Sequence, residues 1–251
     1  MTNYYSLLAP IYERIGLADF AAEMTPQIIQ YAQQHDWTGR SIADLGCGTG
    51  AASRWLTNHG YVTTAIDHSE EMLATARRLQ PTGGLSLSYE KRDLRELANY
   101  HGSFDLVLAF DVINECSSLR ELEPVFQGIS TILEPGKLFV FDVYTIQGLT
   151  KHGAHPERLI FEDPSLMVMT RTDYDYDRQI CAINYLAFHR DGELWRRFDC
   201  ERVLRGYPIQ ALATLLQRTG FTVNTMMTPD FGPYELGRTQ SDRVLFLANK
   251  N

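Results

Sequence analysis

The sequence predicts an α/β protein built on a doubly wound, mostly parallel sheet, and three observations carry this prediction. A short apolar run at 42–45 leads into a glycine-rich turn, and residues 51–56 then have helical spacing. A nearly continuous apolar run at 103–110 is typical of a strand covered on both faces. Between such runs lie segments with helical periodicity, so strands alternate with helices as a parallel sheet requires.

The composition and charge of the chain limit the classes of function that it can have. A chain of 251 residues with 44% hydrophobic and 22% charged residues is an ordinary globular protein, large enough for one α/β domain with a subdomain. The formal charge of −8 and the lack of any basic run disfavour nucleic acid as the partner. Small substrates, including cationic or amine-bearing ones, fit this charge better.

The cysteines indicate a reducing compartment. The four cysteines form no CxxC pair, so we expect buried thiols and neither disulfides nor a metal site. No apolar stretch reaches about 18 residues, and the N-terminus lacks a basic-then-apolar signal pattern. We therefore expect a cytoplasmic protein without a membrane partner.

Two helices are expected before the first strand, over residues 4–15 and 19–34. The first is rich in tyrosine, with Tyr4, Tyr5 and Tyr12 around an apolar segment. Packing in the core is an equal alternative to a functional role for Tyr4 and Tyr5, because tyrosine commonly buries its ring. Tyr12 is favoured as functional.

The turn after the first strand predicts a nucleotide-type pocket. Gly46, Gly48 and Gly50 permit positive φ and close approach of a ligand, and Thr49 is expected to cap the helix that follows. The spacing is GxGxG, which differs from the GxGxxG of dinucleotide-binding folds, and Asp44 stands two residues before the first glycine.

This heptapeptide, Asp-Leu-Gly-Cys-Gly-Thr-Gly at 44–50, resembles the first motif of class I S-adenosylmethionine (SAM) dependent methyltransferases. The resemblance implies SAM as cofactor, S-adenosyl-L-homocysteine as product, and cofactor contacts from Asp44, Gly46, Cys47 and Gly48. The Ala-Pro-Ile-Tyr-Glu segment at 9–13 resembles the Ala-x-x-Tyr-Asp segment that many small-molecule methyltransferases fold over their cofactor. Tyr12 would then contact the cofactor as well.

A second anchor is expected at the end of the second strand, residues 61–66. Asp67 can accept hydrogen bonds from ribose hydroxyls, and the 20 residues between it and the loop match one helix plus one strand. The alternative is that Asp67 only caps the helix expected over 69–80. His68 and Met72 lie beside this anchor, and Met72 is a candidate contact to the adenine edge.

The third strand is expected over residues 84–92 and leads to Asp93 and Leu94 at the same sheet edge. In the resembled family an aspartate here accepts from the adenine amine, while the next residue covers the ring. Aspartate is also common in turns, which is the alternative for Asp93.

The tip of the fourth strand, residues 103–110, lies at the crevice where ligands bind in doubly wound sheets. Phe110 is a candidate cofactor contact. Asp111, Asn114 and Glu115 are candidate substrate contacts, with helix capping as an equal alternative. The Asn/Asp-Pro-Pro-aromatic tetrapeptide of methyltransferases acting on nucleobase amines and glutamine side chains is absent here, which argues against those substrates.

The remaining elements complete the sheet. We expect a helix at 119–133, a turn through Pro135 and Gly136, strands at 137–142, 221–227 and 240–248, and a helix at 208–219. The resemblance implies seven strands in the order 3-2-1-4-5-7-6, with strand seven antiparallel.

Residues 144–205 have β periodicity of another kind, with Asp191-Gly192 marking a hairpin. We expect a three-stranded antiparallel meander, similar to the cap of sugar-amine and glycine-type N-methyltransferases. The SAM-binding domain would comprise 1–143 and 206–251, and the cap 144–205. His152 and His155 are an improbable metal pair because no third ligand is evident. Arg196, Arg197, Glu201 and Arg205 are expected to be mostly solvated strand charges, with a pocket contact from one or two of them as the alternative.

The expected activity is methyl transfer from SAM to a nitrogen or oxygen of a small molecule, by a monomer or homodimer. Tyr12, Asp111 or Glu115 would accept a proton or orient the acceptor, and Tyr12 is the catalytic candidate. Two alternatives stay open. One is an NAD-dependent oxidoreductase, which also uses a glycine turn and an acid after strand two, and the other is a SAM-binding protein without methyl transfer.

Overall fold

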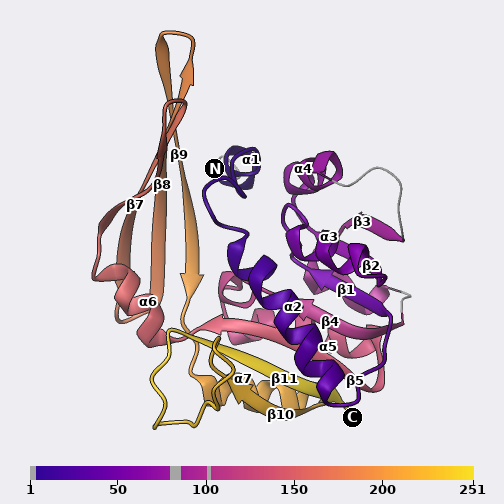
Figure 1. Ribbon diagram of the computed structural model, residues 1–251. Coiled ribbons are helices and arrows are strands. Elements are labelled where there is room, and N and C mark those ends of the chain that lie inside the picture. Colours follow the sequence, from indigo (N-terminus) through magenta and orange to yellow (C-terminus); the bar gives the residue numbers. More distant parts are fainter. Residues whose placement is uncertain (1–3, 80–85, 101–102) are drawn as a thin grey trace.

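Two separate sheets organise the molecule (Figure 1). The computed structural model describes residues 4–79, 86–100 and 103–251. The first sheet has seven strands and lies between layers of helices, and the second has four strands and stands beside it. In the described part of the chain, no helix is long and apolar enough to cross a bilayer.

The seven-stranded sheet confirms the predicted topology. Its strands in chain order are β1 (Ser41–Leu45), β2 (Val62–Asp67), β3 (Leu87–Lys91), β4 (Phe104–Ala109), β5 (Leu133–Tyr144), β10 (Phe221–Met227) and β11 (Arg243–Lys250). Their spatial order is β10-β11-β5-β4-β1-β2-β3, and β11 is antiparallel to both of its neighbours while the other pairs are parallel. Because β1, β2 and β4 are adjacent and parallel, their carboxyl ends meet at one edge.

Helices cover both faces because the central strands are apolar on both sides. They are α2 (Asp19–Gln34), α3 (Ala51–Asn58), α4 (Glu70–Leu79), α5 (Leu119–Ile132) and α7 (Ile209–Arg218), with short 3₁₀ turns η1 (Leu94–Asn99) and η2 (Ile113–Glu115). One core cluster joins α5 and α7 to the sheet, and a second joins α2 to the other face. The predicted bounds agree closely for α2 and β10.

The second sheet differs from prediction in having four strands where three were expected. It consists of β6 (Glu157–Asp163), β7 (Leu166–Asp175), β8 (Ile180–Asp191) and β9 (Leu194–Arg205), preceded by α6 (Ile146–Gly153). The edge strand β6 escapes prediction because none of its residues is fully buried, so no apolar alternation marks it. The predicted hairpin is confirmed, with Gly192 at a φ of 64° between β8 and β9.

The N-terminal segment also departs from prediction. The first helix, α1 (Tyr4–Leu8), ends early, and residues 9–18 form turns where the helix was expected to continue to residue 15. Pro10 supplies no N–H and disfavours helical backbone at the preceding residue, which explains the stop. The apolar side chains Leu8, Ile11 and Ile15 pack on the second sheet. Figure 1 shows α1 between β9 and α4.

Three smaller expectations need correction or lie outside the described residues. Thr49 does not cap α3; Gly50 is the capping residue, with a φ of 77°, and the Thr49 hydroxyl donates to Glu13 instead. The last strand begins at Arg243, three residues later than expected, because Asp242 pairs with Thr145 at the start of α6. Residue 80 of the expected helix and residues 84–85 of the expected third strand lie outside the described residues.

Candidate functional site

The glycine turn after β1 forms the floor of the site. Gly46 and Gly48 have φ values of 64° and 55°, a region that side chains disfavour. A Cβ on Gly46 would come within 2.1 Å of Val112 Cγ2, so only glycine lets the β4 tip lie against the turn. The backbone N–H groups of Gly46 and Cys47 donate to the Ile66 carbonyl at 2.7 and 3.1 Å, which ties the turn to β2.

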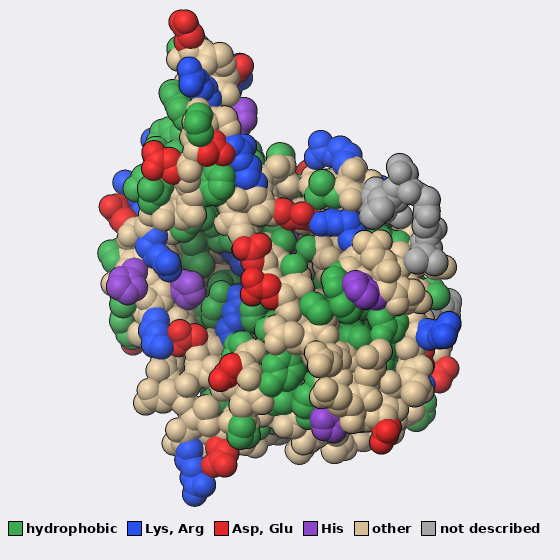
Figure 2. Space-filling model, in the orientation of Figure 1, with side chains coloured by type: hydrophobic (Ala, Val, Ile, Leu, Met, Phe, Trp, Pro, Cys, Tyr) green, Lys and Arg blue, Asp and Glu red, His purple; other side chains and the backbone are tan. Residues whose placement is uncertain are grey.

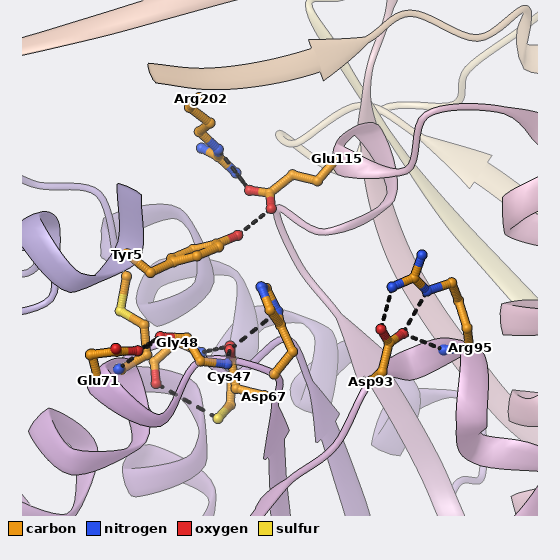
Figure 3. A network of polar contacts seen from close by, with 12 residues as sticks. Tyr5, Cys47, Gly48, Asp67, Glu71, Asp93, Arg95, Glu115 and Arg202 are labelled. Atoms are coloured by element: carbon orange, nitrogen blue, oxygen red, sulfur yellow. Dashed lines mark hydrogen bonds and ion pairs between the residues drawn. The ribbon is translucent and has the colours of Figure 1, made fainter. Parts of the chain in front are cut away.

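Asp67 faces this turn and is almost fully buried. Its Oδ2 accepts from the Gly48 N–H at 2.9 Å and its Oδ1 accepts from the Ser69 N–H at 2.8 Å (Figure 3). One oxygen therefore accepts from the backbone just before α4, as the capping alternative expects, while the other reaches the glycine turn; the ribose contact stays a prediction. His68 Nδ1 lies 3.6 Å from Asp67 Oδ1, and burial is the main cause that raises the Asp67 pKa.

Asp44 lies beneath the turn and not on its open side. It is 3% exposed and accepts a hydrogen bond from the Ser53 hydroxyl on α3. Burial raises the pKa of Asp44 to about 6, and the nearby Asp67 adds to this rise. The Cys47 thiol beside it has a pKa raised by burial, and its sulfur lies 3.8 Å from the Gly48 carbonyl.

The N-terminal segment closes over the site from the side of the second sheet. The Tyr5 hydroxyl donates to Glu115, and the Tyr5 ring meets His68 edge-on with centroids 5.0 Å apart. Glu13 accepts from the Thr49 hydroxyl at 2.7 Å and pairs with Arg54 at 2.8 Å, so this segment is anchored to the turn. Tyr12 Cε1 is 3.9 Å from the position of a Cβ on Gly48.

Four other predicted cofactor contacts are packed against, or paired with, residues outside the glycine turn. Met72 is fully buried in α4, and Phe110 is buried against Phe20 with ring centroids 5.9 Å apart. Asp93 caps η1 and pairs with Arg95, whose hydrogen bond lowers the Asp93 pKa. Leu94 packs on the main core. Their adenine and cofactor roles stay predictions.

At the tip of β4, Asp111 adopts a left-handed backbone with a φ of 57°. Its N–H donates to Asp142 Oδ1 at 2.7 Å, and its carbonyl accepts from Arg202 at 2.9 Å. Its carboxylate pairs with Arg243 at 2.7 Å. Three neighbours therefore hold a strained conformation at the edge where ligands bind in this class of sheet.

Glu115 and Asn114, which follow in η2, have different environments. Glu115 accepts from Tyr5 and pairs with Arg202 of β9 at 2.7 Å, so it joins the N-terminal segment to the second sheet (Figure 3). Asn114 is buried; its amide donates to the carbonyls of Tyr144 and Arg205, and its oxygen accepts from the Tyr144 N–H. The structure gives Asn114 a structural role between the two sheets.

Two arginines of the site were missed by sequence reasoning. The Arg202 side chain is 8% exposed although β9 was expected to carry solvated charges. Arg243 pairs with Asp111 and Asp142, and its guanidinium carbon lies 3.8 Å from the ring centroids of both Phe20 and Tyr144. The sequence did contain a signal for Arg202, because it lies two residues from both Cys200 and Leu204 and so shares the inward face of the strand with them. None existed for Arg243, whose partners are distant in sequence.

Comparison with known proteins agrees with this geometry. Residues 43–141 match the methyltransferase domain family. The protein YqeM of Bacillus subtilis (strain 168), assigned as a methyltransferase, is 26% identical over 242 residues, which span 92% of this chain and 96% of that protein.

Residues 43–141 carry a methyltransferase domain, and the chain has the fold of class I SAM-dependent methyltransferases. A SAM-dependent methyltransferase from Clostridium acetobutylicum ATCC 824 has the same fold, with a TM-score of 0.84, 23% identity, and 99% of this chain and 100% of that chain covered. The sugar N-methyltransferase KedS8 from Streptoalloteichus sp ATCC 53650 superposes with a TM-score of 0.76 at 20% identity, covering 96% of this chain and 92% of that one.

The site of this methyltransferase fits SAM on its own geometry. A carboxylate offers about four lone-pair positions, and Gly48 and Ser69 use two of those on Asp67. No other donor among the described residues forms a hydrogen bond with the remaining positions. The backbone at Gly48 is uncrowded, because the nearest atom to a Cβ there is 3.9 Å away. The contacts of Asp67 with the ribose and of the turn at 46–48 with the amino-acid half of the cofactor stay predictions that this geometry permits.

Proposed function

We propose that this methyltransferase transfers the methyl group of SAM to a nitrogen or oxygen of a small molecule bound between the β4 tip and the second sheet. The single observation that supports this proposal is the contact of Arg202 in β9 with Glu115 and the Asp111 carbonyl. Through it the second sheet covers the edge that carries the glycine turn. An acceptor bound there is enclosed on several sides, which suits a small molecule and excludes water.

SAM supplies a methyl group that its sulfonium already makes electrophilic. The chain then has to hold the acceptor nucleophile about 3 Å away and in line, which is chiefly a positioning task. Asp67 and the turn at 46–48 would fix the cofactor, and the N-terminal segment with Tyr5 and Tyr12 would close over both ligands.

Tyr12 orients the acceptor in this proposal and does not take its proton. Burial is the largest cause that raises the Tyr12 pKa far above its ordinary value, and Arg202 only partly opposes the rise. The phenol therefore stays protonated at neutral pH and can donate or accept a hydrogen bond. Asp111 and Glu115 are each paired with an arginine, so they too serve first to shape the pocket.

Calorimetry and a transfer assay test the proposal. We expect SAM to bind with a dissociation constant in the micromolar range or below, about −8 kcal/mol or stronger, and NAD not to bind. Methyl-labelled SAM should then label one class of amine or hydroxyl compound in a small-molecule library.

Two outcomes would contradict the proposal. Binding of NAD without SAM would favour the oxidoreductase alternative. Tight SAM binding without transfer to any amine or hydroxyl compound would favour a SAM-binding protein that transfers no methyl group.

A further inference from the structure

A pocket at the base of the second sheet brings together four basic side chains that the proposed function does not use. Its volume is about 510 Å³, and it lies between α6, the start of β6 and the residue before β11. The basic side chains in its lining are Lys151, His152, His155 and Arg158. Figure 2 shows histidine and Lys or Arg side chains gathered at this end of the second sheet, beside the hollow between the two sheets.

The acidic side chains of the pocket already have cationic partners. Asp242 pairs with Lys151 at 2.6 Å, and Glu157 pairs with Arg171 of β7 at 3.1 Å. Arg158 has no ion-pair partner within the part of the chain that the structure describes. With Arg171 counted as the partner of Glu157, the Arg158 guanidinium is one cation more than the carboxylates of the pocket pair with, and the two imidazoles can each donate a hydrogen bond.

The pocket adjoins the proposed acceptor site. The His152 ring meets Tyr144 edge-on with centroids 5.3 Å apart, and the Tyr144 hydroxyl accepts from Arg243, which pairs with Asp111. The Tyr144 ring and the Arg243 guanidinium thus lie between His152 of the basic pocket and Asp111 at the β4 tip. A ligand that reaches the β4 tip from this side would pass the basic pocket.

We propose that this pocket binds an oxyanion, a phosphate or carboxylate group carried by the methyl acceptor. This inference rests on the proposed function, because it names the class of acceptor for the same site. An arginine fork with neighbouring imidazole donors matches the planar or tetrahedral oxygens of such groups. Among the described residues, no three His, Cys, Asp or Glu side chains are grouped so as to hold a metal ion.

His152 provides a titratable probe of the pocket. Burial is the first cause that lowers the His152 pKa. The cations Arg158 of β6, Arg243 of β11 and Arg202 of β9 lower it further, whereas Asp242 raises it. A bound anion opposes the effect of these cations and stabilises the protonated imidazole, so it raises the His152 pKa. Anion affinity should therefore increase as pH falls.

Sulfate is the probe of choice, because it stays a dianion across neutral pH whereas phosphate itself titrates. We expect sulfate to shift the ¹⁵N resonances of the His152 imidazole, with binding at least about threefold tighter near about pH 6 than near about pH 8. Arg158→Gln should weaken sulfate binding about tenfold, the value of one charge-assisted contact. Arg196→Gln on the hairpin makes the same change of net charge outside the pocket and should alter binding less than about twofold.

A second measurement uses acceptors. Pairs of amine or hydroxyl compounds that differ by one phosphate or carboxylate group should show a preference of about tenfold in kcat/KM for the anionic member. In Arg158→Gln the preference should vanish through KM, while kcat stays near that of the wild type. His155→Gln provides an independent variant with a smaller effect. Separate phosphate and carboxylate series identify which oxyanion is preferred.

Equal losses of sulfate binding in the Arg158 and Arg196 variants would overturn the inference, as would wild-type protein that binds no sulfate. Absence of any preference among acceptor pairs would also overturn it. The sulfate titration requires no methyl transfer, so its result is independent of the proposed function. A protein that binds sulfate in this pocket but transfers no methyl group would contradict the proposed function alone.

Discussion

At the residue scale, Tyr12 is the side chain whose environment says most about its chemistry. The charged or phenolic groups near its hydroxyl are Arg202, Asp111, Glu115 and Tyr185. The acidic and phenolic neighbours disfavour the negatively charged phenolate form of Tyr12, and burial disfavours it more strongly. The Tyr12 phenol is therefore neutral at ordinary pH, and in our proposal it acts as a hydrogen-bonding group toward the acceptor.

Tyr12→Phe should lower turnover about fivefold to tenfold, which is the usual worth of one hydrogen bond. Affinity for SAM should change less than about twofold, because Asp67 and the glycine turn remain intact. Steady-state kinetics and calorimetry measure the two quantities, and Tyr176→Phe, in an exposed turn of the second sheet, is the control. Unchanged turnover would remove Tyr12 from the reaction.

Asp44 makes the pH dependence of stability testable. Its pKa rises from 3.8 to about 6 on folding, mainly through burial. The folded protein therefore binds this proton more tightly than the unfolded chain does, and stability falls as pH rises through that range.

Asp44→Asn removes the buried charge and should stabilise the ligand-free protein near about pH 8 by up to about 3 kcal/mol. The gain should shrink as pH is lowered through about 6 toward about 4, where the native carboxyl is already neutral. Urea unfolding of both proteins at several pH values measures this difference. A gain that does not vary with pH would contradict burial of the charged form as its source.

At the element scale, β9 carries the second sheet's contribution to the site. Inward and outward residues alternate along it, and Arg202 occupies an inward position between Cys200 and Leu204. Its guanidinium pairs with Glu115 and donates to the Asp111 carbonyl. A strand of the cap therefore fixes the tip of a strand in the main sheet.

Arg202→Met should cost about 3 kcal/mol of unfolding free energy, because it removes a buried guanidinium and leaves the partly buried Glu115 without its cation. Adding Glu115→Gln should recover part of that cost, as coupled residues do in a double-mutant cycle. Denaturant unfolding measures each variant. Val203→Ala, on the exposed face of the same strand, should cost less than about 0.5 kcal/mol. Additive effects of the two site variants would disprove the coupling.

At the scale of the whole molecule, the two sheets are joined where the chain leaves the main sheet and where it returns. Tyr144 ends β5, Arg205 ends β9, and the Asn114 side chain bonds to the backbone of both. This amide fixes the orientation of one sheet on the other. The proposed acceptor site between them depends on that orientation, whereas the glycine turn lies within the main sheet.

Asn114→Ala should therefore raise the acceptor KM at least about threefold, while SAM affinity changes less than about twofold. Unfolding free energy should fall by about 3 kcal/mol, because three backbone groups lose a buried partner. Kinetics and amide exchange at Tyr144 measure the change. The control is Asn224→Ala, on an exposed part of β10. An equal loss of SAM affinity would show that the two halves of the site are not separable.

The sequence determined the features that depend on neighbours along the chain. The glycine turn, the alternation of strands and helices, and the hairpin at Gly192 follow from periodicity and from residues suited to positive φ. The meeting of Asp67 with Gly48 also follows, because β1 and β2 are adjacent parallel strands whose carboxyl ends coincide. The family resemblance then supplied the order of the strands.

The tertiary structure alone decided the acceptor side of the site. Arg202 reaches Glu115 across 87 residues, and Arg243 reaches Asp142 across 101. No local pattern marks such pairs, because a charged side chain becomes buried only when a distant partner compensates its desolvation. The residues of the edge strand β6 likewise do not predict a strand, because none of them is fully buried. Its pairing with β7 is what makes it a strand. Local periodicity therefore fixed the proposed cofactor side of this methyltransferase, and long-range pairing of charges fixed the side that we propose for the acceptor.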